Sequence, residues 1–218
     1  MSILDQTVGH TALSLPGATR IFLTHHIDYG CNGHITLREA AQRAQLNPDM
    51  LASELEALPA NETDPHDWQA SSNSALIDHI LTRYHDVHRQ QLPELTRMAR
   101  RVEQVHGEHD ACPRGLADLL TAIHQEMESH MQKEEQILFP MLRGGLHSQA
   151  QGPITVMRHE HDDHATSLDQ LMTLTNNICP PQGACNTWRA LYTGLSEFRN
   201  DLMQHIHLEN NLLFERVG

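Results

Sequence analysis

The chain has 218 residues and a formal net charge of −13, and this acidity argues against nucleic acid and anionic membranes as partners. No stretch approaches the roughly 20 apolar residues that a membrane span needs, and the N-terminus lacks the basic start and apolar run of a secretory signal. We therefore expect a cytoplasmic protein. Aromatic residues make up only 4%, and a chain rich in Leu, Ala, Glu and Gln favours helices.

The first part of the chain, residues 1–58, is predicted to form a small helical domain. A first-turn proline precedes a helix over Ala18–His26, Thr36 and Glu39 fit a capping box, and Asn47 with Pro48 caps a helix that ends near Leu58. A tight glycine turn, Gly30-Cys31-Asn32-Gly33, lies between the first two helices. Cys31 is a candidate functional thiol.

The remainder is predicted to be an antiparallel four-helix bundle. Residues 59–73 are polar, contain two prolines and lack apolar periodicity, which predicts a linker. Residues 74–218 then contain four amphipathic segments with short connections. We expect these helices at about 74–105, with a disturbance near Pro93, from 113 to 140 or 145, from 153 to 177, and from 186 to 214.

Two sequence patterns recur within the bundle. H-x3-E-x3-L-F occurs from His130 to Phe139 and again from His205 to Phe214. H-D-x-H-x3-L begins at His85 and again at His161. One helical hairpin is therefore followed by a second of the same pattern.

Helical spacing places these polar residues on the apolar, inward-facing stripes. The four expected stripes are Ile77, Leu81, His85, His88, Leu92 and Leu95; Leu116, Leu120, Ile123, Met127, His130, Glu134, Ile137 and Met141; Met157, His161, His164, Leu168 and Leu171; and Trp188, Leu191, Leu195, Phe198, Leu202, His205, Glu209 and Leu212. A single histidine on such a stripe is more often a satisfied core residue. Two buried carboxylates among repeated histidines imply a cation, because a buried charge is costly unless it is paired or bound to metal.

The ligand types narrow the choice of metal. Imidazole and carboxylate without thiolate suit iron, manganese or zinc, and a helical bundle with inward His and Glu is a common dinuclear iron scaffold. The simplest assembly gives each of two irons two histidines, with Glu134 and Glu209 bridging both and with room for an oxo or hydroxo bridge. Because the members of each pair belong to one hairpin, we expect His85 to pair with His130, and His161 with His205.

Other polar residues are weaker candidates. Glu126 and Glu160 could be outer groups or part of an ion path, although solvated glutamates are the default reading. His88 and His164 could be outer or core residues. We expect His124, His159 and His207 to lie on the surface.

The chain resembles the di-iron family that repairs iron–sulfur clusters, also called the repair of iron centres family, whose bundle is similar to haemerythrin. The resemblance rests on the Asp28-Tyr29-x-Cys31-x-Gly33 turn and on the segments RYHDVHRQQLPEL, HMQKEEQILFPM, GPITVMRHEHDDH and HIHLENNLLF. It implies a cytoplasmic protein, often a homodimer, made under nitrosative or oxidative stress, with damaged iron–sulfur proteins as transient partners. It also implies iron ligands at His85, His130, Glu134, His161, His205 and Glu209, in agreement with the set placed by spacing.

One departure from the family leaves three functions open. The family commonly has two adjacent cysteines followed by two glycines in the N-terminal turn, whereas this turn has one of each at those positions. Iron donation to damaged clusters is favoured by the resemblance. Nitric oxide binding, with or without its reduction as an enzymatic activity, needs no cysteine pair. Oxygen carriage as in haemerythrin usually calls for five histidines.

Overall fold

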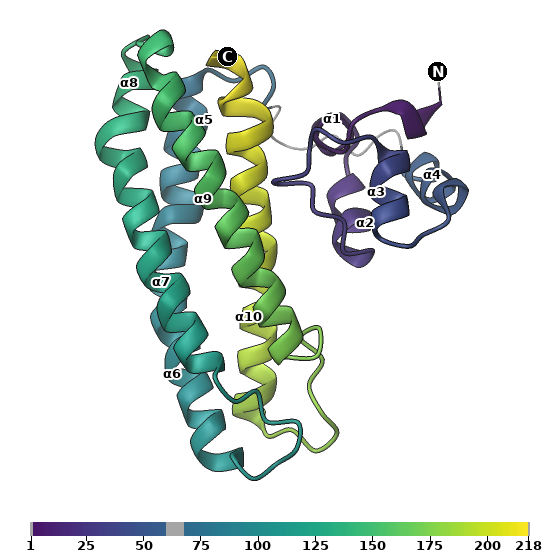
Figure 1. The fold of residues 1–218 in the computed structure, drawn as a ribbon, viewed down its shortest axis with the longest axis vertical. Coiled ribbons are helices and arrows are strands. Elements are labelled where there is room, and N and C mark those ends of the chain that lie inside the picture. The colour runs from purple at the N-terminus through teal and green to yellow at the C-terminus, as the bar shows by residue number, and fades with distance from the viewer. Residues whose placement is uncertain (1, 60–67, 218) are drawn as a thin grey trace. The chain divides into compact units, whose positions relative to one another are not determined.

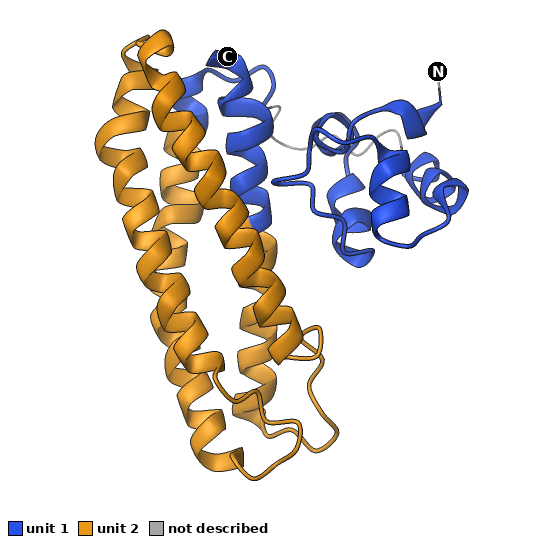
Figure 2. Ribbon diagram, viewed as in Figure 1, with its two compact units in different colours: residues 1–76, 203–218 blue, residues 77–202 orange. Residues whose placement is uncertain are grey.

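The computed structural model describes residues 2–59 and 68–217. These residues form helices and loops, and their one β-type pairing is an isolated bridge between Thr7 and Thr36 (Figure 1). They divide into two compact units, residues 1–76 with 203–218, and residues 77–202 (Figure 2). Most of the predicted linker, residues 60–67, lies outside the described residues. The division of the chain into 1–58, 59–73 and 74–218 stays a proposal.

Short capped helices make up the N-terminal part of the first unit. They are η1 (Ile3–Asp5), α1 (Val8–Ser14), α2 (Ala18–Thr24), α3 (Leu37–Arg43) and α4 (Pro48–Glu56). The Thr36 side chain accepts a hydrogen bond from the Glu39 amide at 3.2 Å, and Asn47 caps α4 with Pro48 in its first turn. The predicted proline start of α2 is wrong, because the helix is preceded by Gly17 in the left-handed region at φ 86°.

A four-helix bundle makes up the second unit, and its last helix continues into the first. The elements are α5 (Asn73–Ile80), η2 (Leu81–His85), α6 (Asp86–His106), α7 (Leu116–Lys133), η3 (Glu134–Leu138), α8 (Phe139–Arg143), α9 (His147–Leu174) and α10 (Asn186–Leu208). The segments η2, η3 and the later η4 (Glu209–Leu213) are π-helical turns, and η5 (Glu215–Val217) is a short 3-10 turn. Successive long helices run in opposite directions (Figure 1).

Packing between these helices follows the predicted stripes over most of their length. The expected apolar residues of α9 and α10 are all buried, and so are those of α7 from Leu116 to Met127. The side chain of Leu95 on α6 lies so close to Gly194 on α10 that an added Cβ would meet it at 2.7 Å. These stripes therefore supply buried residues of the bundle core, whereas Leu81 of the first stripe is only partly buried.

Two prolines behave differently from expectation. α6 continues through Pro93, which is exposed, so water can solvate the carbonyl group that the proline ring displaces. α9 begins at His147, ahead of the predicted start near Pro153, and holds Pro153 inside its first turns. None of the described helices has the length and apolarity that a bilayer span requires.

Candidate metal centre

Three π-helical turns carry residues of the predicted centre. η2 ends at His85, η3 begins at Glu134 and η4 begins at Glu209. In each, the amide of the following residue bonds to the carbonyl five residues earlier, as Phe214 does with Glu209 at 2.8 Å. Such single π turns contain one residue more than an α turn and occur frequently at functional sites.

The extra residue changes which side chains face the core after Glu134. Ile137 and Met141 were predicted on the inner stripe, and this prediction is wrong: Ile137 is 53% exposed and Met141 is only partly buried. Leu138 and Leu142 are buried in their place. The π turn displaces the stripe by one residue, a shift that a strict 3.6-residue period does not include.

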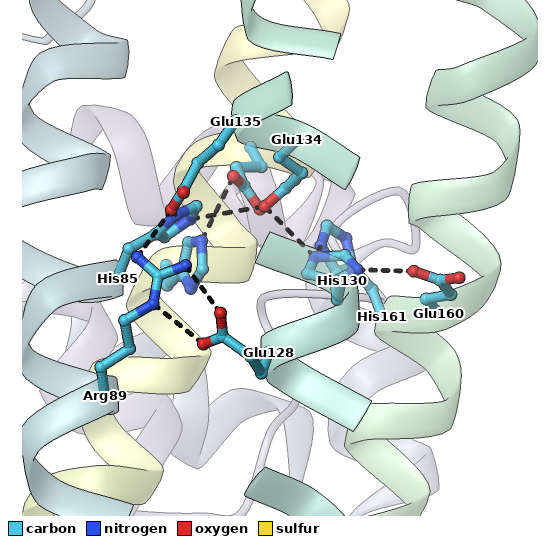
Figure 3. A network of polar contacts seen from close by, with 10 residues as sticks. His85, Arg89, Glu128, His130, Glu134, Glu135, Glu160 and His161 are labelled. Carbon is cyan, nitrogen blue, oxygen red and sulfur yellow. Dashed lines mark hydrogen bonds and ion pairs between the residues drawn. The ribbon is translucent and has the colours of Figure 1, made fainter. Parts of the chain in front are cut away.

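Three imidazoles point their Nε2 atoms at one place in the core (Figure 3). The Nε2 atoms of His85 and His130 lie 3.4 and 3.5 Å from the same oxygen of Glu134. His161 Nε2 lies 3.1 Å from His130 Nε2. On the last helix, His205 Nε2 lies 3.2 Å from a carboxylate oxygen of Glu209. All of these side chains are buried.

The six predicted ligands form two overlapping groups of four. His85, Glu134, His205 and Glu209 make one group, and His130, Glu134, His161 and Glu209 make the other. Within each group, one potential ligand atom per residue lies within 4.8 Å of all the others. Both glutamates belong to both groups, as carboxylate bridges between two metal ions require.

The predicted pairing of histidines by hairpin is wrong. The structure groups His85 with His205 and His130 with His161, so each group takes one histidine from each hairpin. His130 and His161 lie on α7 and α9, which are neighbours in the bundle without being consecutive partners of one hairpin. Adjacency in space decides which imidazoles share a group.

The electrostatics of this core suit a cation. Glu134 is 0% exposed, and neither of its carboxylate oxygens has a hydrogen-bond partner among the described residues. A charged carboxylate that is buried without a partner costs the folded protein roughly several kcal/mol, unless a cation compensates its charge. Two nitrogen ligands at right angles around one metal, each about 2.1 Å from it, lie about 3 Å apart, close to the separation of the His130 and His161 nitrogens. The residues therefore fit a pair of metal ions.

Comparison with known proteins identifies the family. Residues 76–217 match the family described as the hemerythrin HHE cation binding domain, and residues 4–59 match a domain of unknown function, DUF542. The iron-sulfur cluster repair protein YtfE of Yersinia pestis (strain Pestoides F) is 54% identical over 220 residues, which cover 100% of this chain and 98% of the relative. The protein of the same name from Yersinia pseudotuberculosis serotype O:1b (strain IP 31758) is 53% identical over the same share.

The chain belongs to the YtfE family of iron–sulfur cluster repair proteins. All six predicted ligands of this family member lie within its match to the cation binding domain.

Two outer carboxylates orient the imidazoles in this member of the YtfE family (Figure 3). His85 Nδ1 lies 2.8 Å from Glu135, and His130 Nδ1 lies 2.9 Å from Glu160. Glu160 also accepts a hydrogen bond from Lys133, and both contacts bring the pKa of its carboxyl down to about 2. Metal-bound histidines characteristically donate their second N–H to such a carboxylate. Glu160 therefore occupies the outer position considered for it, and Glu135 is an outer group that sequence reasoning missed.

The remaining candidates lie outside the two groups. Glu126 is exposed and joins neither. His88 is buried against Phe198, and His164 is buried against His130, with ring centroids 5.6 and 5.0 Å apart respectively. His159 is exposed, and His124 is partly exposed.

The predicted surface position of His207 is wrong. Its side chain is buried, its Nδ1–H donates to the Tyr29 carbonyl at 3.2 Å, and burial lowers its pKa to about 4. Histidine is often exposed, and the partner of His207 comes from a segment far away in the sequence. Helical spacing within α10 could not reveal it.

The glycine turn that carries Cys31 lies against the end of the last helix. The Asp28 carboxylate accepts hydrogen bonds from the Gly30 and Cys31 amides, each at 2.9 Å. Asn211 Nδ2 donates to the carbonyls of Tyr29 at 3.0 Å and Gly30 at 3.2 Å. These contacts hold the turn by its backbone, and the Cys31 side chain is partly exposed.

Proposed function

We propose that this protein binds two iron ions in the described centre, with Glu134 and Glu209 as bridging ligands and an oxo or hydroxo bridge between the ions. The observation that carries the proposal is the pair of overlapping histidine and glutamate groups that share both glutamates. The match to a cation binding domain over residues 76–217 supports it. Imidazole and carboxylate ligands without thiolate suit this metal.

We further propose that the protein acts in the cytoplasm in the repair of iron–sulfur clusters, as a donor of iron. Its full-length relatives are named iron-sulfur cluster repair proteins, which supports the repair role. Iron held by imidazoles and carboxylates can pass to the thiolate ligands of a damaged cluster, since thiolates compete well for it. Iron is here the cargo, and the chain's own residues must hold it reversibly.

Reactivation of a damaged enzyme tests the donor role. A dehydratase whose [4Fe–4S] cluster has been damaged by nitric oxide is incubated anaerobically with iron-loaded protein, with metal-free protein, or with an equal amount of free Fe²⁺ and a chelator. The chelator is present in all three samples. If the protein donates iron, only the sample with iron-loaded protein should regain dehydratase activity. Equal reactivation by the metal-free protein would contradict iron donation.

A second candidate function is the binding of nitric oxide at the same centre, with or without its reduction. The observation that favours it is the single thiol of the glycine turn, because Cys31 has no neighbouring cysteine for a handover by two thiolates. Ferrous iron with an exchangeable position supplies the chemistry for such a small ligand. Anaerobic addition of nitric oxide to the reduced protein, followed by EPR spectra and gas analysis for N2O, distinguishes binding from reduction.

A further inference from the structure

A chain of charged side chains extends outward from His85 to the bundle surface. Glu135 accepts a hydrogen bond from His85 Nδ1 at 2.8 Å, and the same oxygen accepts one from Arg89 Nη1 at 2.8 Å. The Nε of Arg89 donates to Glu128 at 2.9 Å (Figure 3). Arg89 and His85 are one helical turn apart on the first long helix, whereas Glu128 and Glu135 come from the second.

Arg89 contacts Glu135 and Glu128, so one guanidinium binds two carboxylates at once. The N–H groups of a planar guanidinium point in fixed directions, so Arg89 can hold both carboxylates in a defined geometry. A lysine ammonium lacks this fixed arrangement of donors. The hydrogen bonds with Glu128 and Glu135 raise the pKa of Arg89 above its ordinary value, and contacts with Arg89 and His85 hold the pKa of Glu135 down despite its partial burial. Because the Glu135 oxygen that meets His85 also accepts from Arg89, its contact with the ring is a hydrogen bond donated by His85 Nδ1–H.

The consequence for His85 is geometric. With Nδ1 protonated and directed at Glu135, the lone pair of the ring lies on Nε2, the atom that faces Glu134 at 3.4 Å. Rotation of the ring would break the Nδ1 contact. Outer partners of this kind fix both the tautomer and the orientation of a metal ligand.

We propose that Arg89 is a positioning residue for the metal site that contains His85 and His205, acting through Glu135 on the His85 imidazole. This inference rests on the proposed metal centre. It concerns one of the two sites only, since His130 is oriented by a different carboxylate, that of Glu160, which is bound in turn by Lys133. The two halves of the centre are thus supported by separate outer networks.

Binding of iron to the full-length protein tests the proposal. Wild-type protein and the Arg89→Met variant are loaded anaerobically with ⁵⁷Fe²⁺ and then challenged with a competing chelator. We expect the variant to bind both irons but to hold one equivalent about 10- to 100-fold more weakly, the usual effect of removing an outer partner. The Mössbauer doublet of that iron should broaden, whereas the other doublet stays as in the wild type.

The matched control is Arg83→Met. Arg83 also makes two hydrogen bonds to a carboxylate on another helix, Asp201 at 2.6 and 2.9 Å, and this ion pair is separate from the network around Glu135. This variant should lose a comparable ion pair and leave both doublets and both affinities unchanged. Equal weakening of both irons in Arg89→Met and in Arg83→Met would reduce Arg89 to a structural role and overturn the proposal.

Two further variants decide the matter if Arg89→Met does not fold. Arg89→Lys keeps the positive charge but loses the planar guanidinium that binds both carboxylates. Glu135→Gln removes the carboxylate that accepts from His85, while Arg89 stays. Both should weaken the same single equivalent of iron, and unchanged affinity in both would overturn the proposal. A wild-type protein that fails to bind two irons would instead refute the metal centre itself, which separates the two failures.

Discussion

The Nε2 atoms of His130 and His161 lie 3.1 Å apart, although the two residues belong to different hairpins of the bundle. Because His130 donates its Nδ1 proton to Glu160, its Nε2 presents a lone pair to this gap. A cation between the two nitrogens would use this lone pair and, with His161 in the same tautomer, that of His161 Nε2 as well. In the proposed centre, His130 and His161 would therefore bind the same metal ion.

Double alanine variants should therefore follow the spatial groups. His130→Ala with His161→Ala should leave one iron per chain, and so should His85→Ala with His205→Ala, because each combination removes the histidines of one group. His85→Ala with His130→Ala takes one histidine from each group and should loosen both irons. Iron content after desalting measures this. A single tightly held iron in the last variant would restore the hairpin pairing.

Removal of a shared glutamate should affect both irons. Glu134→Ala should abolish magnetic coupling and weaken both ions, whereas His161→Ala should mainly loosen one. In metal-free protein, Glu134→Gln should raise stability by about 1–3 kcal/mol, because it removes a buried and unsatisfied carboxylate. Mössbauer spectra and thermal unfolding follow the two effects. A coupled iron pair that survives Glu134→Ala would refute the bridge.

Because of the π turn that begins at Glu134, substitutions at Ile137 and Leu138 should differ in their effect on the stability of the protein. Ile137→Gln should change stability by less than about 0.5 kcal/mol, since the Ile137 side chain is 53% exposed. Leu138→Ala should cost about 2–5 kcal/mol, because Leu138 is buried. Urea unfolding of both variants measures the difference. The reverse order of stability would show that the helix keeps a regular α-helical period at this point.

Gly33 and Asn211 should be energetically coupled. A Cβ added at Gly33 would lie 2.0 Å from Asn211 Oδ1, and the three nearest atoms all belong to Asn211. Gly33→Ala alone should destabilise the protein by about 1–3 kcal/mol through overpacking. In the Asn211→Ala background the same change should cost clearly less. A double-mutant cycle measures the coupling, and strictly additive effects would mean that the turn does not contact Asn211 in solution.

Cys31→Ser should leave iron binding intact and slow the transfer of iron to a damaged cluster. We expect the turn to keep its shape, because Asp28 binds the backbone amides of residues 30 and 31, which the substitution leaves in place. A thiolate can ligate iron in passing, which a serine hydroxyl does poorly. Reactivation of the dehydratase at equal iron loading measures the rate. Equal rates would remove Cys31 from the mechanism and favour nitric oxide binding.

Much of the fold was predictable because the bundle obeys simple periodicity. The stripes that contain His161 and His205 are buried along their whole predicted length, and the repeated motifs mark the six residues that the structure brings together. Periodicity failed at Ile137 because a π turn adds a residue that no local signal announces. It also failed for the outer network, since Arg89 and Glu135 meet across two helices and each alone resembles an ordinary surface charge.

The pairing of histidines and the burial of His207 share one cause. Both depend on which elements become neighbours after folding, and a motif records spacing along one helix only. His130 lies next to His161 on α9, and His207 hydrogen-bonds to the Tyr29 carbonyl in the N-terminal segment. Such tertiary contacts can be predicted only when the packing of the helices against one another is known.

Opposite faces of the last helix have different partners. His205 and Glu209 belong to the metal groups, whereas His207 and Asn211, each two residues further on and so about 200° around the axis, hold the turn that carries Cys31. A binding event on one face that orders this stretch must favour the contact on the other, and thermodynamic linkage makes the effect equal in both directions. Any coupling between metal binding by His205 and Glu209 and the docking of the turn that carries Cys31 would therefore have the same size in both directions.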